Sequence, residues 1–149
     1  MKAIKMFFLV MLVFLLASCS SIKLEPANFA WPIESVVATD DNGNVAIERY
    51  STEFNASALF RTELGDSVIV PGRELRIIRD NLGNYLMTSQ GFMNVYVFII
   101  DEGAFVQTNK IFISKEGMTN PAFNQRTPNI ELVDNEITYI IDSKGSKRK

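Results

Sequence analysis

Residue types able to do chemistry are few in this chain of 149 residues. It has no histidine and a single cysteine, Cys19. The missing imidazole rules out Ser-His-Asp and Cys-His catalysis, and with them histidine-ligated zinc. Carboxylates remain, but Asp101 and Glu102 are adjacent, and neighbouring side chains of an extended chain point to opposite faces. The sequence therefore predicts a protein that is not an enzyme and that has no metal site and no cofactor.

One stretch rich in acid and amide groups is similar to the opening of a calcium-binding loop. Asp40, Asn42 and Asn44 alternate with other residues, as the first ligands of such a loop do. Glycine, however, falls at loop position four instead of six, and position twelve is Ser51 instead of glutamate. An Asn-Gly pair between two apolar runs is a strong signal for a tight hairpin turn. The turn explains Asn42 and Gly43 without an ion.

A long polar stretch, residues 117–129, is the candidate contact site of the domain. Other connections in the chain are short, and connections of this length are often functional. Phenylalanine and arginine are also residue types that anchor interfaces. The alternative is a mobile surface loop stiffened by its two prolines. The residues expected to contact a partner or ligand are Asn120, Phe123, Asn124, Gln125 and Arg126.

The amino-terminal residues carry a targeting pattern. Two lysines precede an apolar run of eleven residues, whereas a membrane-spanning helix needs about 20. The run ends at Leu16-Ala17-Ser18-Cys19, which resembles the lipobox of bacterial lipoprotein signal peptides. The resemblance implies that signal peptidase recognises Leu16, Ala17 and Ser18, that residues 1–18 are a cleaved signal helix, and that Cys19 receives lipid. An ordinary secretory signal with a chance cysteine is the alternative.

The same resemblance implies a location in the bacterial cell envelope, with the lipid as membrane anchor. Each buried lipid methylene contributes about 0.8 kcal/mol, so two or three acyl chains hold a protein on its membrane. Residues 19–25 are then a lipidated tether, whose six residues after Cys19 span about 20 Å at most. Serine instead of aspartate follows Cys19, which resembles the pattern of lipoproteins sent to the outer membrane. We therefore expect a domain at the outer membrane that faces the periplasm.

Charge is distributed unevenly along the mature chain. Removing Lys2 and Lys5 with the signal leaves 13 basic and 17 acidic side chains, a net charge of −4. Four of the basic residues lie in residues 143–149, so the chain before them carries a net charge of −8. This acidic balance argues against nucleic acid as a partner, because phosphate contacts need a basic face. We expect the basic end to be a frayed, solvated tail, with a contact to anionic lipid as the alternative.

Residue patterning in the rest of the chain is typical of β-structure. Residues 33–39 and 44–50 flank the Asn-Gly turn, and residues 74–79 and 85–89 flank a second turn that contains Gly83. Residues 95–100 are apolar on both faces, which predicts a central strand covered on both sides.

One segment allows two interpretations. Residues 56–64 lie between Asn55, a good helix cap, and Gly65, a good helix end, so they form either the end of a strand or one short helix. Short strands at regular spacing predominate elsewhere. Residues 26–142 are therefore predicted to form a single all-β domain, an antiparallel β-sandwich or small barrel of about nine strands.

The function we expect first is that of a structural or accessory subunit, which acts through contacts with an envelope protein. The alternative is a β-sandwich binding module for a glycan, a cell-wall fragment or a small envelope ligand. A subunit is expected to expose an apolar patch on its surface. A binding module is expected to carry a concave pocket in which polar groups converge.

Overall fold

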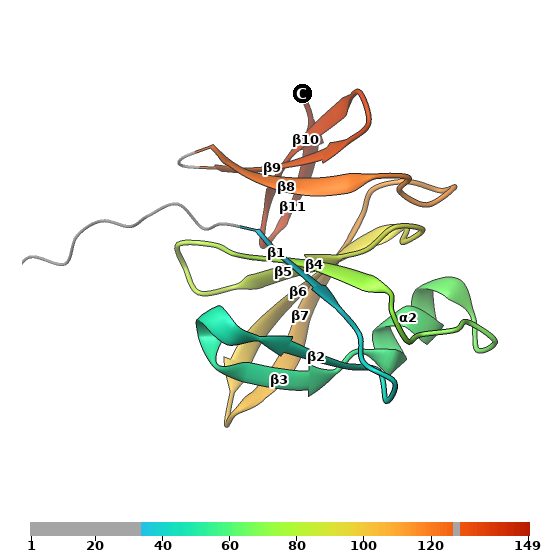
Figure 1. Cartoon of the computed structure of the whole chain (residues 1–149). Coiled ribbons are helices and arrows are strands. Elements are labelled where there is room, and N and C mark those ends of the chain that lie inside the picture. Colours follow the sequence, from blue (N-terminus) through green and yellow to red (C-terminus); the bar gives the residue numbers. More distant parts are fainter. Residues whose placement is uncertain (1–33, 127–128) are drawn as a thin grey trace, which may run out of the picture.

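The computed structural model describes residues 34–126 and 129–149 (Figure 1). The residues expected to form the signal peptide (1–18) and the lipidated tether (19–25) lie outside the described residues. The elements, in chain order, are β1 (Ser35–Ala38), β2 (Asn44–Ile47), the short 3-10 helix η1 (Glu48–Tyr50), β3 (Thr52–Asn55), the α-helix α2 (Ser57–Leu64), β4 (Glu74–Arg79), β5 (Tyr85–Thr88), β6 (Asn94–Asp101), β7 (Ala104–Phe112), β8 (Pro121–Arg126), β9 (Asn129–Asp134), β10 (Ile137–Asp142) and β11 (Gly145–Arg148).

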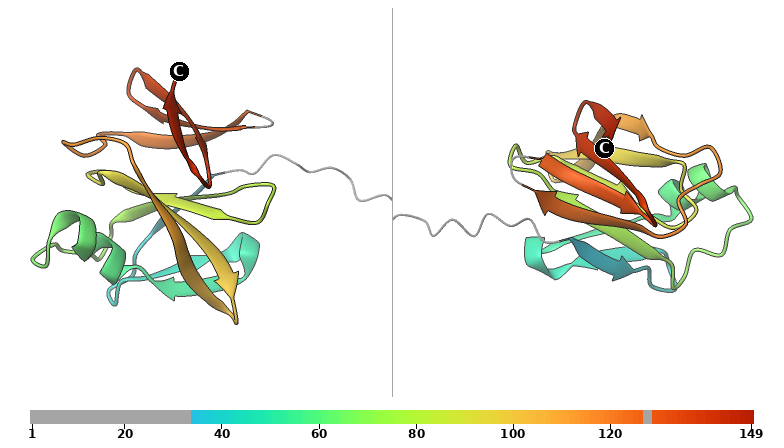
Figure 2. Two further views of the ribbon diagram at one scale, coloured as in Figure 1. Left: turned by 180° about the vertical axis from the view of Figure 1, so that it is seen from behind. Right: turned by 90° about the horizontal axis from the view of Figure 1, so that it is seen from above.

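The strands form three antiparallel sheets. The central sheet has five strands in the order β1-β4-β5-β6-β7, the carboxyl-terminal sheet has four in the order β11-β10-β9-β8, and β2 pairs with β3. The carboxyl-terminal sheet covers one side of the central sheet and the β2–β3 hairpin covers the other (Figures 1 and 2). The central sheet keeps two edge strands, β1 and β7, and does not close into a barrel. The predicted antiparallel all-β fold is confirmed, with eleven strands in the described part instead of about nine.

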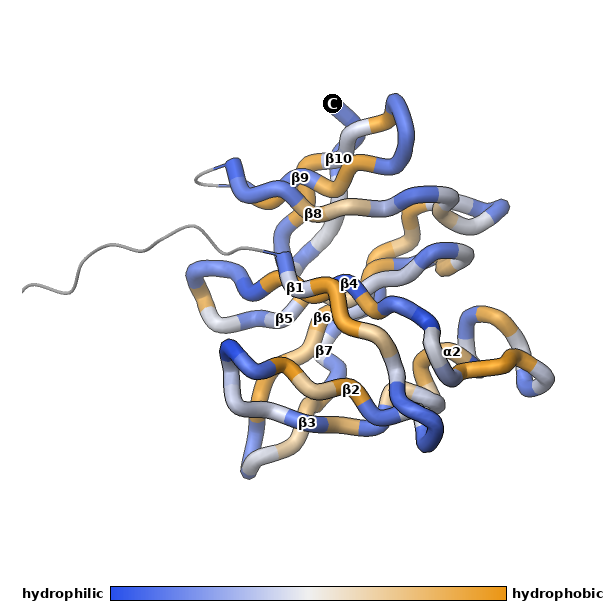
Figure 3. The backbone as a smooth tube through the Cα atoms, in the orientation of Figure 1, coloured by the Kyte–Doolittle hydropathy of each residue, from blue (hydrophilic) through white to orange (hydrophobic). Residues whose placement is uncertain are grey.

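Both faces of the central sheet are buried because its strands carry apolar residues at successive positions. All four residues of β5 and the first four of β6 are buried. The strand register places Ile77, Met87 and Tyr96 side by side on one face, and the residues next to them on the other. Hydrophilic residues gather at the turns (Figure 3). The core therefore continues through the central sheet from one outer layer to the other.

The strand that we expected to be covered throughout is covered over only half of its length. Ile99 and Ile100 of β6 are 36 % and 46 % exposed. The pairing of β5 with β6 ends at Phe98, and beyond this point β6 has only β7 beside it. The β6–β7 hairpin therefore extends past the rest of the sheet, which leaves apolar side chains at its end in contact with water.

Of the two interpretations of residues 56–64, the short helix is the correct one, and it begins directly after a strand. β3 ends at Asn55, whose side-chain oxygen accepts a hydrogen bond from the Ser57 amide at 3.0 Å. At the other end of α2, Gly65 has a φ of +91° and its amide donates to the Arg61 carbonyl. Phe60 is the buried residue of this helix and its ring packs against Phe92, with 5.2 Å between centroids. The helix is thus held against the central sheet by an aromatic pair.

The basic carboxyl-terminal residues form a strand, so the expectation of a frayed tail is wrong. β11 pairs with β10 along its whole length, and the Lys149 amide donates to the Thr138 carbonyl. The turn before it is fixed by Asp142, whose carboxylate accepts from the amides of Lys144 and Gly145. β11 is an edge strand, and lysine at an edge is a common protection against unwanted strand pairing. In the sequence, the basic residues of this segment resemble a solvated tail, so the strand was not predicted.

Acid is expected to loosen β11. The Lys149 ammonium lies 2.8 Å from a carboxylate oxygen of Glu131, and this hydrogen bond, with Arg126 nearby, holds the pKa of Glu131 below its usual 4.5. A pKa lowered by folding gives stabilisation that is complete above the unfolded pKa and is lost as pH falls through the folded one. Hydrogen-exchange protection of the β11 amides should therefore decrease between about pH 6 and about pH 3.

A matched variant separates this contact from general acid unfolding. Lys149→Gln removes the charged partner of Glu131, so the acid-dependent part of the β11 protection should shrink while that of β5 stays the same. Protection of β11 that is independent of pH in the unmodified chain would contradict the role assigned to the ion pair.

Candidate functional site

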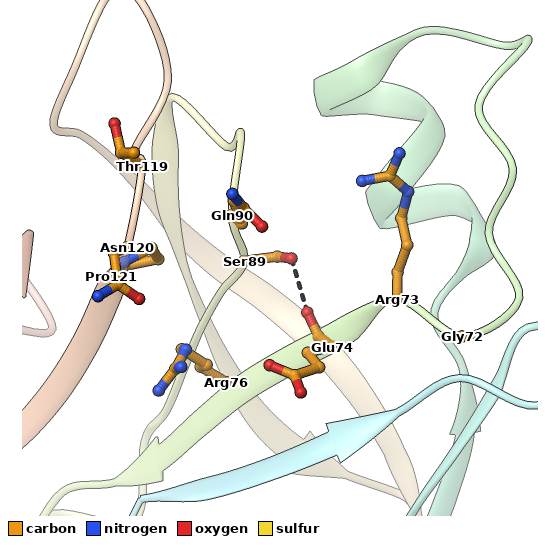
Figure 4. Close-up of a pocket in the computed structure, with 9 residues that line it drawn as sticks. All are labelled: Gly72, Arg73, Glu74, Arg76, Ser89, Gln90, Thr119, Asn120 and Pro121. Atoms are coloured by element: carbon orange, nitrogen blue, oxygen red, sulfur yellow. Dashed lines mark hydrogen bonds between the residues drawn. The ribbon is translucent and has the colours of Figure 1, made fainter.

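A polar cleft of about 530 Å³ opens between the central and the carboxyl-terminal sheets. Three chain segments meet there, namely the start of β4, the turn after β5 and the residues that lead into β8. The cleft is lined by Gly72, Arg73, Glu74, Arg76, Ser89, Gln90, Thr119, Asn120 and Pro121 (Figure 4).

Backbone hydrogen bonds join two of these segments. The Gly91 amide donates to the Met118 carbonyl at 2.7 Å, and the Met118 amide donates to the Phe92 carbonyl at 2.8 Å. Gly117 has a φ of +81°, and a Cβ atom there would come within 2.5 Å of the Gly91 carbonyl oxygen. Only glycine allows this close approach. The wall that carries Gln90, Thr119 and Asn120 is therefore a fixed structure.

Glu34 connects the two sheets beside the cleft. One of its carboxylate oxygens lies 2.9 Å from an Nη atom of Arg76 in β4, and the other accepts a hydrogen bond of 2.8 Å from the Phe123 amide in β8. The side chains of Arg76 and Glu34 are 21 % and 15 % exposed. A guanidinium carries five N–H donors, so Arg76 keeps donors beyond those used by Glu34. Its position at the cleft is fixed by the ion pair.

The other lining side chains differ in their orientation. The Arg73 side chain points away from Asn120, and its Nε donates to the Ile69 carbonyl (Figure 4). Ser89 donates to the backbone carbonyl of Glu74 at 2.6 Å. Asn120 has its backbone amide bound to Asp134 at 2.7 Å, while its side chain lies on the cleft wall.

The chemistry of the lining is mixed and mainly polar. It presents the Arg76 guanidinium, the side-chain amides of Gln90 and Asn120, the hydroxyl of Thr119 and one carboxylate, Glu74, while the buried Ser89 hydroxyl is bound to the Glu74 carbonyl. Such a set can both donate and accept hydrogen bonds. Acid–base catalysis with two carboxylates needs a second one across the cleft, and Glu74 is the only carboxylate among the lining residues. The lining therefore offers both hydrogen-bond donors and acceptors to a polar ligand.

The predicted contact residues do not form one site. The stretch expected as a connection contains β8, and strand geometry sends alternate side chains to opposite faces. Phe123 and Gln125 are buried, at 4 % and 9 % exposure, while Asn124 and Arg126 face solvent. Asn120, just before the strand, is the one member that lines the cleft. Phe123 therefore contributes to the core and is not an interface anchor.

Most of the cleft was not predicted from the sequence. Glu74 and Ser89 were predicted only as the first and last residues of two strands, and nothing was predicted for Gln90. Arg76 gives the one signal available, because it lies between Leu75 and Ile77 in an otherwise apolar strand. A charged residue in such a place is expected to have a partner. The identity of that partner, Glu34, is visible only in the structure.

The carboxylates of Asp40 and Asp80 accept hydrogen bonds from the backbone of their own turns. Asp40 accepts hydrogen bonds from the amides of Asn42 and Asn44 at 2.8 and 2.7 Å, and the bond from the Asn44 amide contributes most to lowering the pKa of Asp40. Asp80 binds the amides of Leu82 and Asn84 in the same way. In residues 34–126 and 129–149, no group of three or more acidic residues or cysteine is placed to hold a metal ion. The hairpin turn thus accounts for the calcium-like spacing.

Two further observations complete the description. None of the helices in the described part of the chain is long and apolar enough to cross a membrane. No protein-family model, curated protein or solved structure matches the chain. A functional conclusion therefore depends on the residues of the cleft and on the amino-terminal pattern.

Proposed function

We propose that this chain is a lipid-anchored protein of the bacterial envelope whose β domain binds a neutral polar ligand, a glycan or cell-wall fragment, in the cleft between its two larger sheets. The observation that carries the proposal is the polar lining of a cleft of about 530 Å³, to which three chain segments contribute Arg76, Gln90, Thr119 and Asn120. The lipobox-like residues before Cys19 support the anchor, and serine instead of aspartate after Cys19 supports the location at the outer membrane, on its periplasmic side.

Sugar hydroxyl groups suit this lining because each of them donates one hydrogen bond and accepts others. Amides and hydroxyls on the cleft walls offer both functions, and the Arg76 guanidinium supplies donors. Arg76 is already held by Glu34, so a ligand does not have to immobilise a free arginine side chain. We propose binding without turnover.

The length of chain between the lipid anchor and the domain limits how far from the membrane the domain can bind its ligand. Glu34 comes 15 positions after Cys19, and an extended chain spans about 3.3–3.6 Å per residue. The beginning of the domain therefore stays within about 50 Å of the lipid-bearing residue. A fixed, polymeric ligand close to the membrane fits this restriction, and the cell wall is such a polymer.

A second function is favoured by a different surface. Ile99 pairs with Val106 at the end of the β6–β7 hairpin, and these side chains are 36 % and 43 % exposed. Ile100, on the opposite face of the hairpin, is 46 % exposed. β7 is also an edge strand of the central sheet. Exposed apolar clusters often mark protein contacts. Action as an accessory subunit of an envelope assembly is therefore the alternative proposal.

Binding of glycans tests the first proposal. The lipidated chain, in nanodiscs of phosphatidylethanolamine and phosphatidylglycerol, would be titrated calorimetrically with soluble cell-wall fragments and with unrelated oligosaccharides. Replacing both Gln90 and Asn120 by alanine should weaken saturable binding about tenfold, since it removes two hydrogen-bonding groups. Asn124→Ala is the matched control, because Asn124 is an exposed asparagine of β8 outside the cleft.

Two results would contradict the glycan proposal. One is the absence of saturable binding for every fragment tested. The other is an equal loss of affinity in the control variant, which would place the contact on β8 instead of in the cleft.

A further inference from the structure

A second pocket, of about 250 Å³, lies on the other face of the central sheet, between α2 and the ends of β3 and β7. Its character differs from that of the polar cleft, because aromatic and aliphatic side chains form most of its wall. The pocket is lined by Phe54, Asn55, Ala56, Ala58, Leu59, Thr62, Met87, Tyr96, Phe98, Phe105 and Gln107.

Four aromatic rings of this wall are held in a fixed arrangement. Phe105 contacts Phe54 and Phe98 at angles of 61° and 83°, with centroid distances of 4.8 and 6.2 Å. Tyr96 and Phe98 lie nearly parallel, at 23° and 6.4 Å. The three phenylalanines are only partly buried, although they pack against the core. Part of their aromatic surface is therefore available to an occupant of the pocket.

A carboxylate stands directly behind this aromatic wall. The Tyr96 hydroxyl donates to Glu63 in α2 at 2.6 Å, and the same carboxylate accepts from the Asn94 side chain and from the Met93 amide. A phenol that donates to an anion gains electron density in its ring, which strengthens the attraction of the ring for a cation.

The distribution of charge in the domain also favours binding of a cation at this pocket. Residues 34–120, which include the central sheet, α2 and the β2–β3 hairpin, carry 12 acidic and 7 basic side chains, whereas residues 121–149 carry 4 acidic and 5 basic ones. β11 belongs to the sheet on the opposite side of the central sheet from α2 and β3 (Figure 1). A cation that approaches the aromatic pocket therefore meets the acidic part of the molecule.

We propose that this pocket binds a quaternary ammonium group, such as the trimethylammonium of choline, by cation–π contact with Phe54, Phe98 and Phe105, behind which the buried Tyr96 lies. A cavity of about 150 Å³ lined by apolar residues is known to hold benzene, so the pocket has room for a trimethylammonium group. A primary ammonium would need hydrogen-bond acceptors, and the lining is mainly aromatic and aliphatic. A methylated cation needs none of them, and aromatic cages are the usual sites for it.

Comparison of choline with its neutral carbon isostere, 3,3-dimethylbutan-1-ol, tests the proposal. The two molecules have the same shape and differ in charge. The lipidated chain in the choline-free nanodiscs described above would be titrated with each compound, with binding followed by the shifts of protein methyl and aromatic resonances. Choline should bind about fivefold more tightly than the alcohol. Equal or tighter binding of the alcohol, or no binding of choline, would overturn the proposal.

Variants locate the contact. Phe98→Leu keeps the pocket apolar but removes one ring, and it should weaken choline binding about fivefold. Phe112→Leu is the matched control, because Phe112 of β7 is 61 % exposed and lies outside the lining; it should leave the affinity unchanged. If Phe98→Leu does not fold, the comparison of the two compounds on the unmodified chain still decides the matter.

Parallel titrations with phosphocholine and glycine betaine identify the source of the cation. Tighter binding of phosphocholine would assign the pocket to a headgroup on a lipid or polymer, and tighter binding of glycine betaine to a free solute. Failure of glycan binding in the polar cleft would have no bearing on this result, because the two sites lie on opposite faces of the central sheet.

Discussion

Replacing Glu63 by alanine is expected to lower the free energy of unfolding by about 3–4 kcal/mol. The Glu63 carboxylate accepts three hydrogen bonds, from the Met93 amide, the Asn94 side chain and the Tyr96 hydroxyl, all between 2.6 and 2.7 Å. Each charge-assisted bond contributes about 1.5–3 kcal/mol, and water that enters the space replaces part of that. The phenol is most affected, since burial and the bond to Glu63 raise the pKa of Tyr96 above its usual 10.0.

The test is equilibrium unfolding in urea, followed by circular dichroism. Arg61→Ala is the matched control, because Arg61 is an exposed residue of the same helix; it should change the free energy of unfolding by less than about 0.5 kcal/mol. Glu63→Gln should give an intermediate value, since it keeps one acceptor oxygen. A loss below about 1 kcal/mol for Glu63→Ala would show that α2 is held by Phe60 alone.

Local signals in the sequence predicted the local parts of the fold. The turns at Asp40 and Asp80 have the same design, in which the aspartate side chain binds two amides of its own loop. Such turns depend on residues only a few positions apart. The helix α2 was recognisable for the same reason, because Asn55 and Gly65 mark its ends.

Two strands, β8 and β11, were not predicted from the sequence, because only their pairing with neighbouring strands identifies them. β8 begins with Pro121 and contains Asn124, Gln125 and Arg126, which resemble a loop when read without neighbours. As an edge strand it can have a proline at its first position and polar residues on its outer face. β11 was concealed in the same way by its lysine and arginine residues. In both cases pairing with β9 or β10 decides the structure, and pairing is not a property of the segment itself.

The candidate site was the least predictable part, since it depends on contacts between distant residues. The ion pair that fixes Arg76 joins positions 42 residues apart, and the bond from Phe123 to Glu34 joins positions 89 residues apart. Residues 117–129 were chosen for their length and composition, yet only Asn120 of the predicted set reaches the cleft. These residues lie close together because the two sheets stack on each other, and contacts between sheets cannot be predicted from a single sequence.

Cys19→Ala is expected to abolish incorporation of radiolabelled palmitate and to leave the chain with its signal peptide uncleaved. The reason lies in the chemistry of the lipobox that the resemblance implies. Diacylglycerol is transferred to the thiol, and the peptidase cuts only after this transfer. Cys19 is the one cysteine of the chain, so no other thiol can take the lipid. Labelling of cells, with the molecular mass of the product measured by mass spectrometry, checks both effects.

Ser20→Ala serves as the matched control for Cys19→Ala, because it changes the next residue without removing a thiol, and its labelling and cleavage should be normal. Palmitate that persists on Cys19→Ala would contradict the lipoprotein assignment. Cleavage that persists without any label would instead identify an ordinary secretory signal, which releases the domain from the membrane. Since one acyl chain holds a protein only marginally, and two or three hold it firmly, the number of chains found on Cys19 also decides whether the cleft stays beside the membrane.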